Sequence, residues 1–300
     1  TTAAIDALPP GSLVVANEYV PNRAMVLSEN LTKWGDSSVV VSKGDTAKYR
    51  KLKNFLYSQN SINTYKSCPL KFKYKYIDKV NWKQDDENSR DYYENLKLGT
   101  DFHLICERYF SNIPTGIEYC ENHDFHIWLD KIKRLIPLED KNIYLPEYEV
   151  RFKLDDISIQ DKYDLVIISE NNISIWDWKT ENRKLEHKNV ENRMQTIIYL
   201  FLAKEVIPKL YNKDISCENI SINYYQPEYY NEPITIKYSE EKHIQNKKNI
   251  KNYIDTIRTT SYEDENSLKN NNHCKFCEFN KLCNKEEVNY EAWEDENYES

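Results

Sequence analysis

The chain has 300 residues, of which 40% are hydrophobic and 30% are charged, with a formal net charge of -8 and a pI near 5.5. This length suffices for a sizeable core, and the acidic balance excludes a protein coated with positive charge, so any nucleic-acid site has to be a local basic patch. The five glycines form no nucleotide-phosphate loop, which argues against an ATPase motor, and the absence of a long apolar run or a secretory signal pattern leads us to expect a cytoplasmic protein without a membrane segment.

Residues 1–47 differ in composition from the rest, since they hold six of the eight alanines. Apolar runs at 13–16 and 39–41 flank a helical pattern over 21–34, which predicts a β-α-β fragment. One segment reads LVVANEYVPNRAMVLSENLTKWG and is followed by VVVSKGD. It resembles part of the Rossmann domain of the NOL1/NOP2/Sun RNA cytosine-5 methyltransferases. That resemblance implies that Glu18 matches the residue that holds the ribose of S-adenosylmethionine. The glycine loop and the Pro-Cys motif of that family are missing, so we expect a non-functional remnant.

A second piece runs from about residue 55 to 288, followed by an acidic tail at 289–300. Its hydrophobic periodicity predicts an α/β domain. A helical part comes first, followed by three strands, then a helix and then one further strand. This order implies a mixed sheet flanked by helices. The expected helices lie near 61–76, 95–111, 124–136, 190–206 and 239–259, and the expected strands at 147–154, 157–169, 173–179 and 219–226.

Three charged residues carry the chemistry. Asp164 stands in the run DKYDLVII, and Asp177 and Lys179 follow in IWDWKT. Since side chains alternate along a strand, Asp177 and Lys179 should project from one face, with Trp176 and Trp178 on the other. Phosphodiester hydrolysis needs a cation that activates water, and positive charge near the developing pentavalent phosphate. Two aspartates and a lysine supply these parts, and hard carboxylate oxygens favour Mg²⁺ or Mn²⁺.

This pattern resembles the PD-(D/E)XK nucleases, in which an acidic residue on one strand precedes a D/E-x-K triplet on the next. Asp164 matches the first element, and Asp177-Trp178-Lys179 matches the second. The resemblance implies a restriction-endonuclease-like α-β-β-β-α-β core with helical N- and C-terminal parts. It also implies a metal-dependent DNA nuclease of the RecB-like branch. The favoured activity is that of an exonuclease, and the favoured substrates are single strands or duplex ends.

Further matches come from two helices. The RecB-like branch completes its metal site with a histidine in the setting G-x-x-x-H, and the chain reads Gly99-Thr-Asp-Phe-His103. The resemblance thus implies metal binding by His103, Asp164 and Asp177. A glutamine and a tyrosine four residues apart are also typical of the family, and Gln195 and Tyr199 match them on one side of the next helix.

Two acidic residues leave alternatives open. The family often has a glycine three residues before the first aspartate, and here Asp161 stands at that position. Asp161 could be the ligand, but it should point to the face opposite Asp164, so Asp164 is preferred. Glu149 in the preceding strand is either an extra acidic contact or an exposed strand residue.

The cysteines near the C-terminus form a C-x2-C-x5-C run of Cys274, Cys277 and Cys283. In a reducing compartment such clustering favours metal ligation, and three thiolates need a fourth ligand. Cys68, in an early Cys-Pro-x-x-Phe, is the candidate, with His273 as an alternative. The pairing resembles iron–sulfur RecB-like nucleases, including AddB-type domains and the exonucleases of CRISPR adaptation. It implies a structural 4Fe-4S cluster that joins the C-terminal segment to the first helix, with zinc as the alternative.

Basic residues interleaved with aromatic ones could contact DNA, either as phosphate ligands or simply as solvated helix faces. They occur at Lys48 to Lys53, at Lys71 to Lys75, and at Arg183, Lys184 and Lys188. A helicase or integrase partner is a further expectation. The competing hypothesis is a catalytically silent iron–sulfur DNA-binding subunit of a recombination complex, which would be free to lose Asp164, Asp177 and Lys179.

Overall fold

A computed structural model describes residues 14–18, 39–43, 52, 55–80, 90–181 and 183–286. The chain divides into two units, Thr1–Asn54 and Phe55–Ser300. In the first unit, strand β1 (Val14–Glu18) pairs in parallel with strand β2 (Val39–Lys43). A parallel pair requires a crossover connection. The helix expected between these strands lies outside the described residues, as does the acidic tail.

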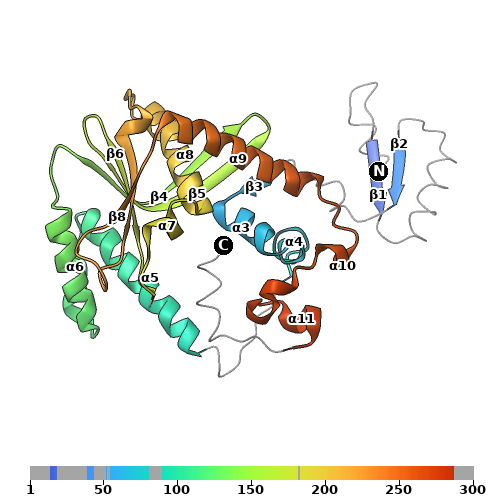
Figure 1. The fold of residues 1–300 in the computed structure, drawn as a ribbon, viewed down its shortest axis with the longest axis horizontal. Helices are drawn as coiled ribbons and strands as arrows, with labels where there is room; N and C mark the ends of the chain where they lie inside the picture. Colours follow the sequence, from blue (N-terminus) through green and yellow to red (C-terminus); the bar gives the residue numbers. More distant parts are fainter. Residues whose placement is uncertain are drawn as a thin grey trace. The chain divides into compact units, whose positions relative to one another are not determined.

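The second unit is built on a six-stranded mixed sheet (Figure 1). Its order is β3-β5-β6-β7-β8, with β4 also paired to β5. β3 and β5 run parallel, as do β6 and β7, whereas the other pairs are antiparallel. The α/β fold with a mixed central sheet is therefore confirmed. The strands are β3 (Leu56–Tyr57), β4 (Ile143–Leu154), β5 (Ile157–Ile168), β6 (Ile173–Trp178), β7 (Ile220–Tyr225) and β8 (Ile234–Lys237).

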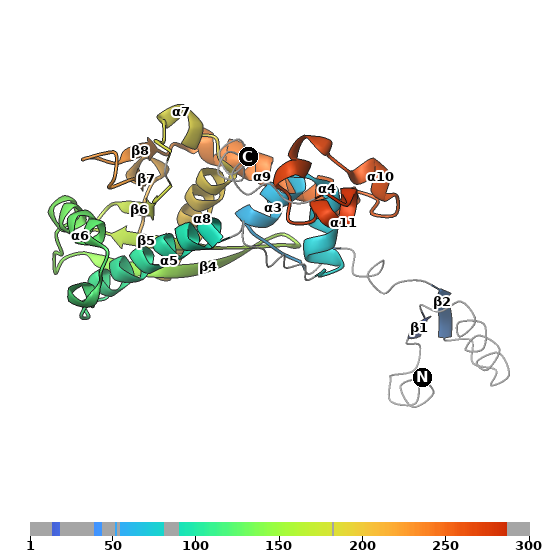
Figure 2. The ribbon, with the colours of Figure 1, turned by 90° about the horizontal axis from the view of Figure 1, so that it is seen from below.

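Helices cover both faces of this sheet (Figures 1 and 2). α5 and α6 pack on the face that carries Trp176 and Trp178, and α8 packs on the other, with α9 against it. The helical elements are α3 (Gln59–Ser67), α4 (Pro69–Phe72), η2 (Lys73–Ile77), α5 (Arg90–Phe110), η4 (Ile117–Tyr119), α6 (His123–Leu135), α7 (His187–Val190), α8 (Met194–Leu210), η5 (Cys217–Asn219), α9 (Glu240–Thr259), α10 (Glu265–Leu268), η6 (Asn271–Phe276) and α11 (Asn280–Asn284).

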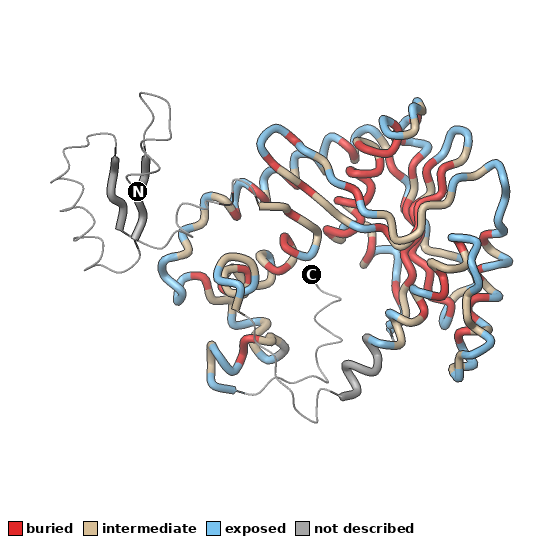
Figure 3. The backbone as a smooth tube through the Cα atoms, turned by 180° about the vertical axis from the view of Figure 1, so that it is seen from behind, coloured by how far each residue is buried: buried red, intermediate tan, exposed pale blue. Residues whose placement is uncertain are grey.

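Local sequence explains why these elements form. Asn122 caps the start of α6, because its side chain accepts a hydrogen bond from the backbone N–H of Asp124, and the apolar residues of α6 recur at helical spacing. α8 is apolar on almost every side because it lies between the sheet and α9. Figure 3 shows buried stretches gathered in the central strands and in α8. Among the described helices, none has both the length and the apolar character that crossing a membrane requires.

The central strands diverge at one point. β5 pairs with β6 from Leu165 opposite Trp176 to Ile168 opposite Ile173. Before Leu165 the two strands separate, and β3 pairs with β5 at Ser158 and Ile159, while β4 pairs with β5 along its whole length. At the point of separation, Asp164 accepts a hydrogen bond from the backbone N–H of Trp178, with 2.8 Å between Oδ2 and N. The split therefore exposes a carboxylate between two strands.

Candidate active site

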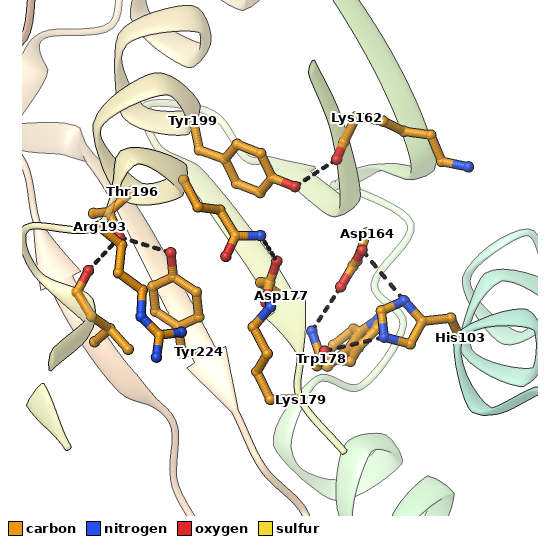
Figure 4. Close-up of polar contacts among 12 residues, drawn as sticks. His103, Lys162, Asp164, Asp177, Trp178, Lys179, Arg193, Thr196, Tyr199 and Tyr224 are labelled. Atoms are coloured by element: carbon orange, nitrogen blue, oxygen red, sulfur yellow. Dashed lines mark hydrogen bonds and ion pairs between the residues drawn. The ribbon is translucent and has the colours of Figure 1, made fainter. Parts of the chain in front are cut away.

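The end of β6 separates charged from aromatic side chains, as the alternation predicts. Trp176 and Trp178 stack with ring centroids 5.9 Å apart in the core beneath α5 and α6. Asp177 and Lys179 face α8 (Figure 4), and their carboxylate oxygen and ammonium lie 2.8 Å apart. Gln195 of α8 donates a hydrogen bond to the other oxygen of Asp177 at 2.6 Å. The carboxylate is thus held from two sides.

Asp177 is buried, with only 1% of its surface exposed, and the Lys179 side chain is 18% exposed. Burial raises the pKa of Asp177, and the Lys179 ammonium opposes that shift. Burial also works against the Lys179 charge, but the neighbouring carboxylates outweigh it and raise the pKa of Lys179 above its usual range. Each charge therefore depends on the other.

His103 of α5 reaches the split from the opposite direction. Its Nδ1 lies 3.4 Å from Asp164 Oδ1, and its Nε2 lies 3.1 Å from the carbonyl oxygen of Trp178. Burial lowers the pKa of His103, but the hydrogen bond and charge of Asp164 outweigh it, so the net pKa is raised. Gly99 lets α5 approach this closely, because an added Cβ would lie 3.1 Å from the Thr180 hydroxyl.

The structure places a further carboxylate here that the sequence analysis missed. Ligand atoms of His103, Glu147 and Asp164 all lie within 4.8 Å of one another. Asp177 lies outside that group. Glu149, named above instead, is an exposed strand residue paired with Arg151. A signal did exist, since reading the Asp155-Asp156 pair as a two-residue turn would have placed Glu147 opposite Asp164.

Gln195 and Tyr199 share one side of α8 but do different things. The Tyr199 hydroxyl donates to the carbonyl of Lys162 at 2.7 Å, so it fixes the backbone of β5 next to Asp164. Asp161 also has a structural partner, because its Oδ2 accepts from the backbone N–H of Gln59 at the start of α3 at 2.9 Å. Asp161 thus contacts the start of α3, whereas Asp164 lies at the split between β5 and β6.

The predicted cysteine ligands line one pocket between α4 and the C-terminal segment. Its lining includes Cys68, Cys274, Cys277, Cys283 and His273. The backbone N–H of Asn270 points to the Cys68 sulfur at 3.5 Å, across some 200 residues of sequence. α4, α10 and α11 lie side by side in both views (Figures 1 and 2). No three of the four sulfurs lie within 4.8 Å of one another.

The expected basic stripe is largely neutralised. Lys71 and Lys75 both pair with Glu278, and Lys73 pairs with Asp78 and Glu265. Lys71 and Lys73 therefore bind the C-terminal segment, a role that differs from both the phosphate ligands and the solvated helix face expected above. Residues 48–51 and 53 lie outside the described part of the chain.

The other basic group follows Lys179 in an exposed loop, and Gln226 anchors that loop. The Gln226 side chain accepts from the backbone N–H of Leu185 at 2.7 Å and donates to the carbonyl of Arg183 at 2.8 Å. Arg183 and Lys184 are thereby carried on a backbone tied to the end of β7, and Lys188 follows in α7.

Similarity to known proteins identifies the family of this chain. The structure is similar to that of a candidate exonuclease from Eubacterium rectale, at 11% identity and a TM-score of 0.45 over 81% of this chain and 91% of that one. It is also similar to the protein SSO0001, at 14% identity and a TM-score of 0.35 over 79% and 94% of the two chains. No curated protein matches the sequence. The family model of the PD-(D/E)XK nuclease superfamily matches residues 57–284. Because that match covers more than half of the chain, the protein belongs to the PD-(D/E)XK nuclease superfamily.

Proposed function

We propose that this protein is a divalent-metal-dependent deoxyribonuclease that hydrolyses phosphodiester bonds, acting as an exonuclease on single strands or duplex ends. The observation that carries this proposal is the meeting of His103 and Asp164 with the Asp177 and Lys179 pair at the split between β5 and β6. A structural ion pair alone would not need the imidazole and the second carboxylate beside it. We propose a role in DNA repair, recombination or defence in the cytoplasm.

A hard divalent cation fits here, since one imidazole nitrogen and two carboxylate oxygens, from His103, Glu147 and Asp164, lie within 4.8 Å of one another, with Asp177 on the neighbouring strand. A bound Mg²⁺ or Mn²⁺ would supply Lewis-acid activation of a water and charge neutralisation at the scissile phosphate. His103, Asp164 and Asp177 would hold it. Lys179 would then turn its ammonium toward the phosphate and stabilise the charge that develops there.

Digestion of end-labelled single- and double-stranded DNA tests this function, with Mg²⁺, Mn²⁺ or EDTA. We expect cleavage that needs metal and falls at least about 100-fold in Asp164→Asn, because that change removes one charged ligand. Asp255→Asn, on the exposed side of α9, is the control. If a folded wild-type protein binds DNA but leaves it intact, the silent DNA-binding subunit becomes the better description.

We also propose that the cysteine pocket holds a 4Fe-4S cluster. Four thiols line one pocket, and no competing disulfide uses them. Four thiolates also suit a single zinc ion, which is the alternative. The cluster would then fasten the C-terminal segment to α4.

Replacing Cys68 with serine should remove the cluster. We expect iron content to fall from about four atoms per chain to near zero, with loss of the visible absorbance. The free energy of unfolding should fall by roughly 3 kcal/mol, because a link between distant segments is lost. Iron analysis and thermal unfolding of anaerobically purified protein measure both effects. Cys120→Ser is the control, since Cys120 lies outside the pocket. Stoichiometric zinc in the wild type would contradict the cluster.

For the first unit we propose no catalytic role. Residues 1–47 would be a methyltransferase-like remnant joined to the nuclease domain at 55–288. Removing residues 1–47 should leave a soluble, active nuclease, and loss of folding would overturn this assignment. A helicase or integrase would be the partner that supplies unwound or cut DNA to the enzyme.

A further inference from the structure

Glu147 occupies an unusual position in the β4–β5 hairpin. Its neighbours Pro146 and Tyr148 pair with Leu165 and Tyr163, so Glu147 lies opposite Asp164. Its φ is 49°, in the left-handed region that residues other than glycine adopt with strain. Such strain persists only where the surroundings require it, and it often marks a functional residue. The strain here coincides with the candidate metal site.

The two oxygens of the Glu147 carboxylate face different groups. Oε1 lies 4.0 Å from His103 Nδ1, and a carboxylate oxygen of Glu147 is within 4.8 Å of the ligand atoms of both His103 and Asp164. Oε2 forms an ion pair with the ammonium of Lys162. The Glu147 side chain is 20% exposed, and that of Lys162 is 54% exposed. Glu147 thus stands between the site and a solvent-facing cation.

We propose that Glu147 is an additional protein ligand of the divalent cation, and that Lys162 is the counter-ion that holds the carboxylate until the metal binds. This inference rests on the proposed metal-dependent nuclease. An ammonium and a divalent cation compete for the same carboxylate, so metal binding releases Lys162. The released ammonium then lies at the rim of the site, where a phosphate of the nucleic-acid backbone can contact it.

Titration of the full-length protein with Mn²⁺, with free ion followed by electron paramagnetic resonance and no DNA present, tests this proposal. Glu147→Gln should weaken Mn²⁺ binding at least about tenfold. Lys162→Met should strengthen it about threefold, because the competing cation is gone, and this gain should vanish in the double variant. Glu149→Gln is the matched control, since it removes the same charge two residues along the same strand from an exposed side chain.

A variant that relieves the strain separates ligation from damage to the fold. Glycine adopts a left-handed φ freely. Glu147→Gly should therefore keep or raise the melting temperature while it weakens Mn²⁺ binding as much as Glu147→Gln. Damage to the fold would instead lower both the melting temperature and the affinity for Mn²⁺. If Glu147→Gln binds Mn²⁺ as Glu149→Gln does while Asp164→Asn loses binding, the metal site stands and the role of Glu147 is overturned. If Asp164→Asn also binds normally, the proposed metal site itself fails.

Discussion

Replacing Lys179 with methionine should reduce the rate of DNA cleavage at least about 100-fold, because the group that stabilises charge on the phosphate is lost. It should also lower the free energy of unfolding by roughly 3 kcal/mol at pH 8, since Asp177 remains buried without its counter-ion. The stability loss should shrink toward pH 6, because burial raises the pKa of Asp177 and a neutral carboxyl needs no partner. Urea unfolding and single-turnover cleavage measure the two effects.

A double variant separates the two effects of Lys179→Met. Asp177→Asn combined with Lys179→Met removes both charges of the pair, so stability should largely return while activity stays lost. Lys209→Met is the control for loss of a lysine, because Lys209 is exposed and pairs with Glu205 on the surface of α8. Recovery of cleavage in the double variant would show that Lys179 only compensates the charge of Asp177.

Stability should also depend on pH through Asp161. Burial raises the pKa of Asp161 to about 7, although the Gln59 and Lys162 backbone N–H groups oppose that shift. The folded state therefore holds this proton more tightly than the unfolded state, whose pKa is about 3.9. The stabilisation of the folded state by this bound proton is fully present below about pH 4 and is lost as the pH rises to about 7. Above that pH, burial of the charge costs up to about 4 kcal/mol.

The variant Asp161→Asn keeps an oxygen that accepts from Gln59 but carries no charge. Its free energy of unfolding should match that of the wild type near pH 4 and exceed it by up to about 4 kcal/mol at pH 8. Urea titrations at several pH values measure the difference. Asp155→Asn is the control, because that carboxylate is fully exposed and Lys251 lowers its pKa. If the free energies of unfolding of the wild type and of Asp161→Asn change with pH in the same way, Asp161 is ionised throughout this pH range.

Local sequence patterns were enough to predict most of the fold. Strand-like patterns predicted β4, β5, β6 and β7, although β4 begins four residues earlier than expected, and helical periodicity predicted α5, α6, α8 and α9 to within five residues at each end. The strands β3 and β8 were not predicted. They have two and four residues, so their backbone hydrogen bonds depend on neighbours distant in sequence and leave little periodicity to read.

The proposed catalytic residues likewise divide into features that local sequence predicts and contacts that depend on distant segments. The sequence alone placed Asp177 and Lys179 on one side of a strand, because alternation is a local property of the backbone. It also placed Gln195 and Tyr199 on one side of a helix. What Tyr199 contacts could not be read from spacing, because the carbonyl of Lys162 reaches it only through packing of α8 on the sheet.

Only the tertiary structure decided how the site is assembled. The meeting of His103 with Asp164 depends on how closely α5 packs against the end of β6, and the place of Glu147 depends on hairpin register. The lysines at 71–75 carry positive charge in the sequence, yet folding pairs them with acids of the C-terminal segment. By itself the sequence determined the elements and the chemical groups, because backbone periodicity and side-chain chemistry are local. Contacts between distant segments required the folded chain, because a local pattern does not record which of several acidic or basic groups will be neighbours.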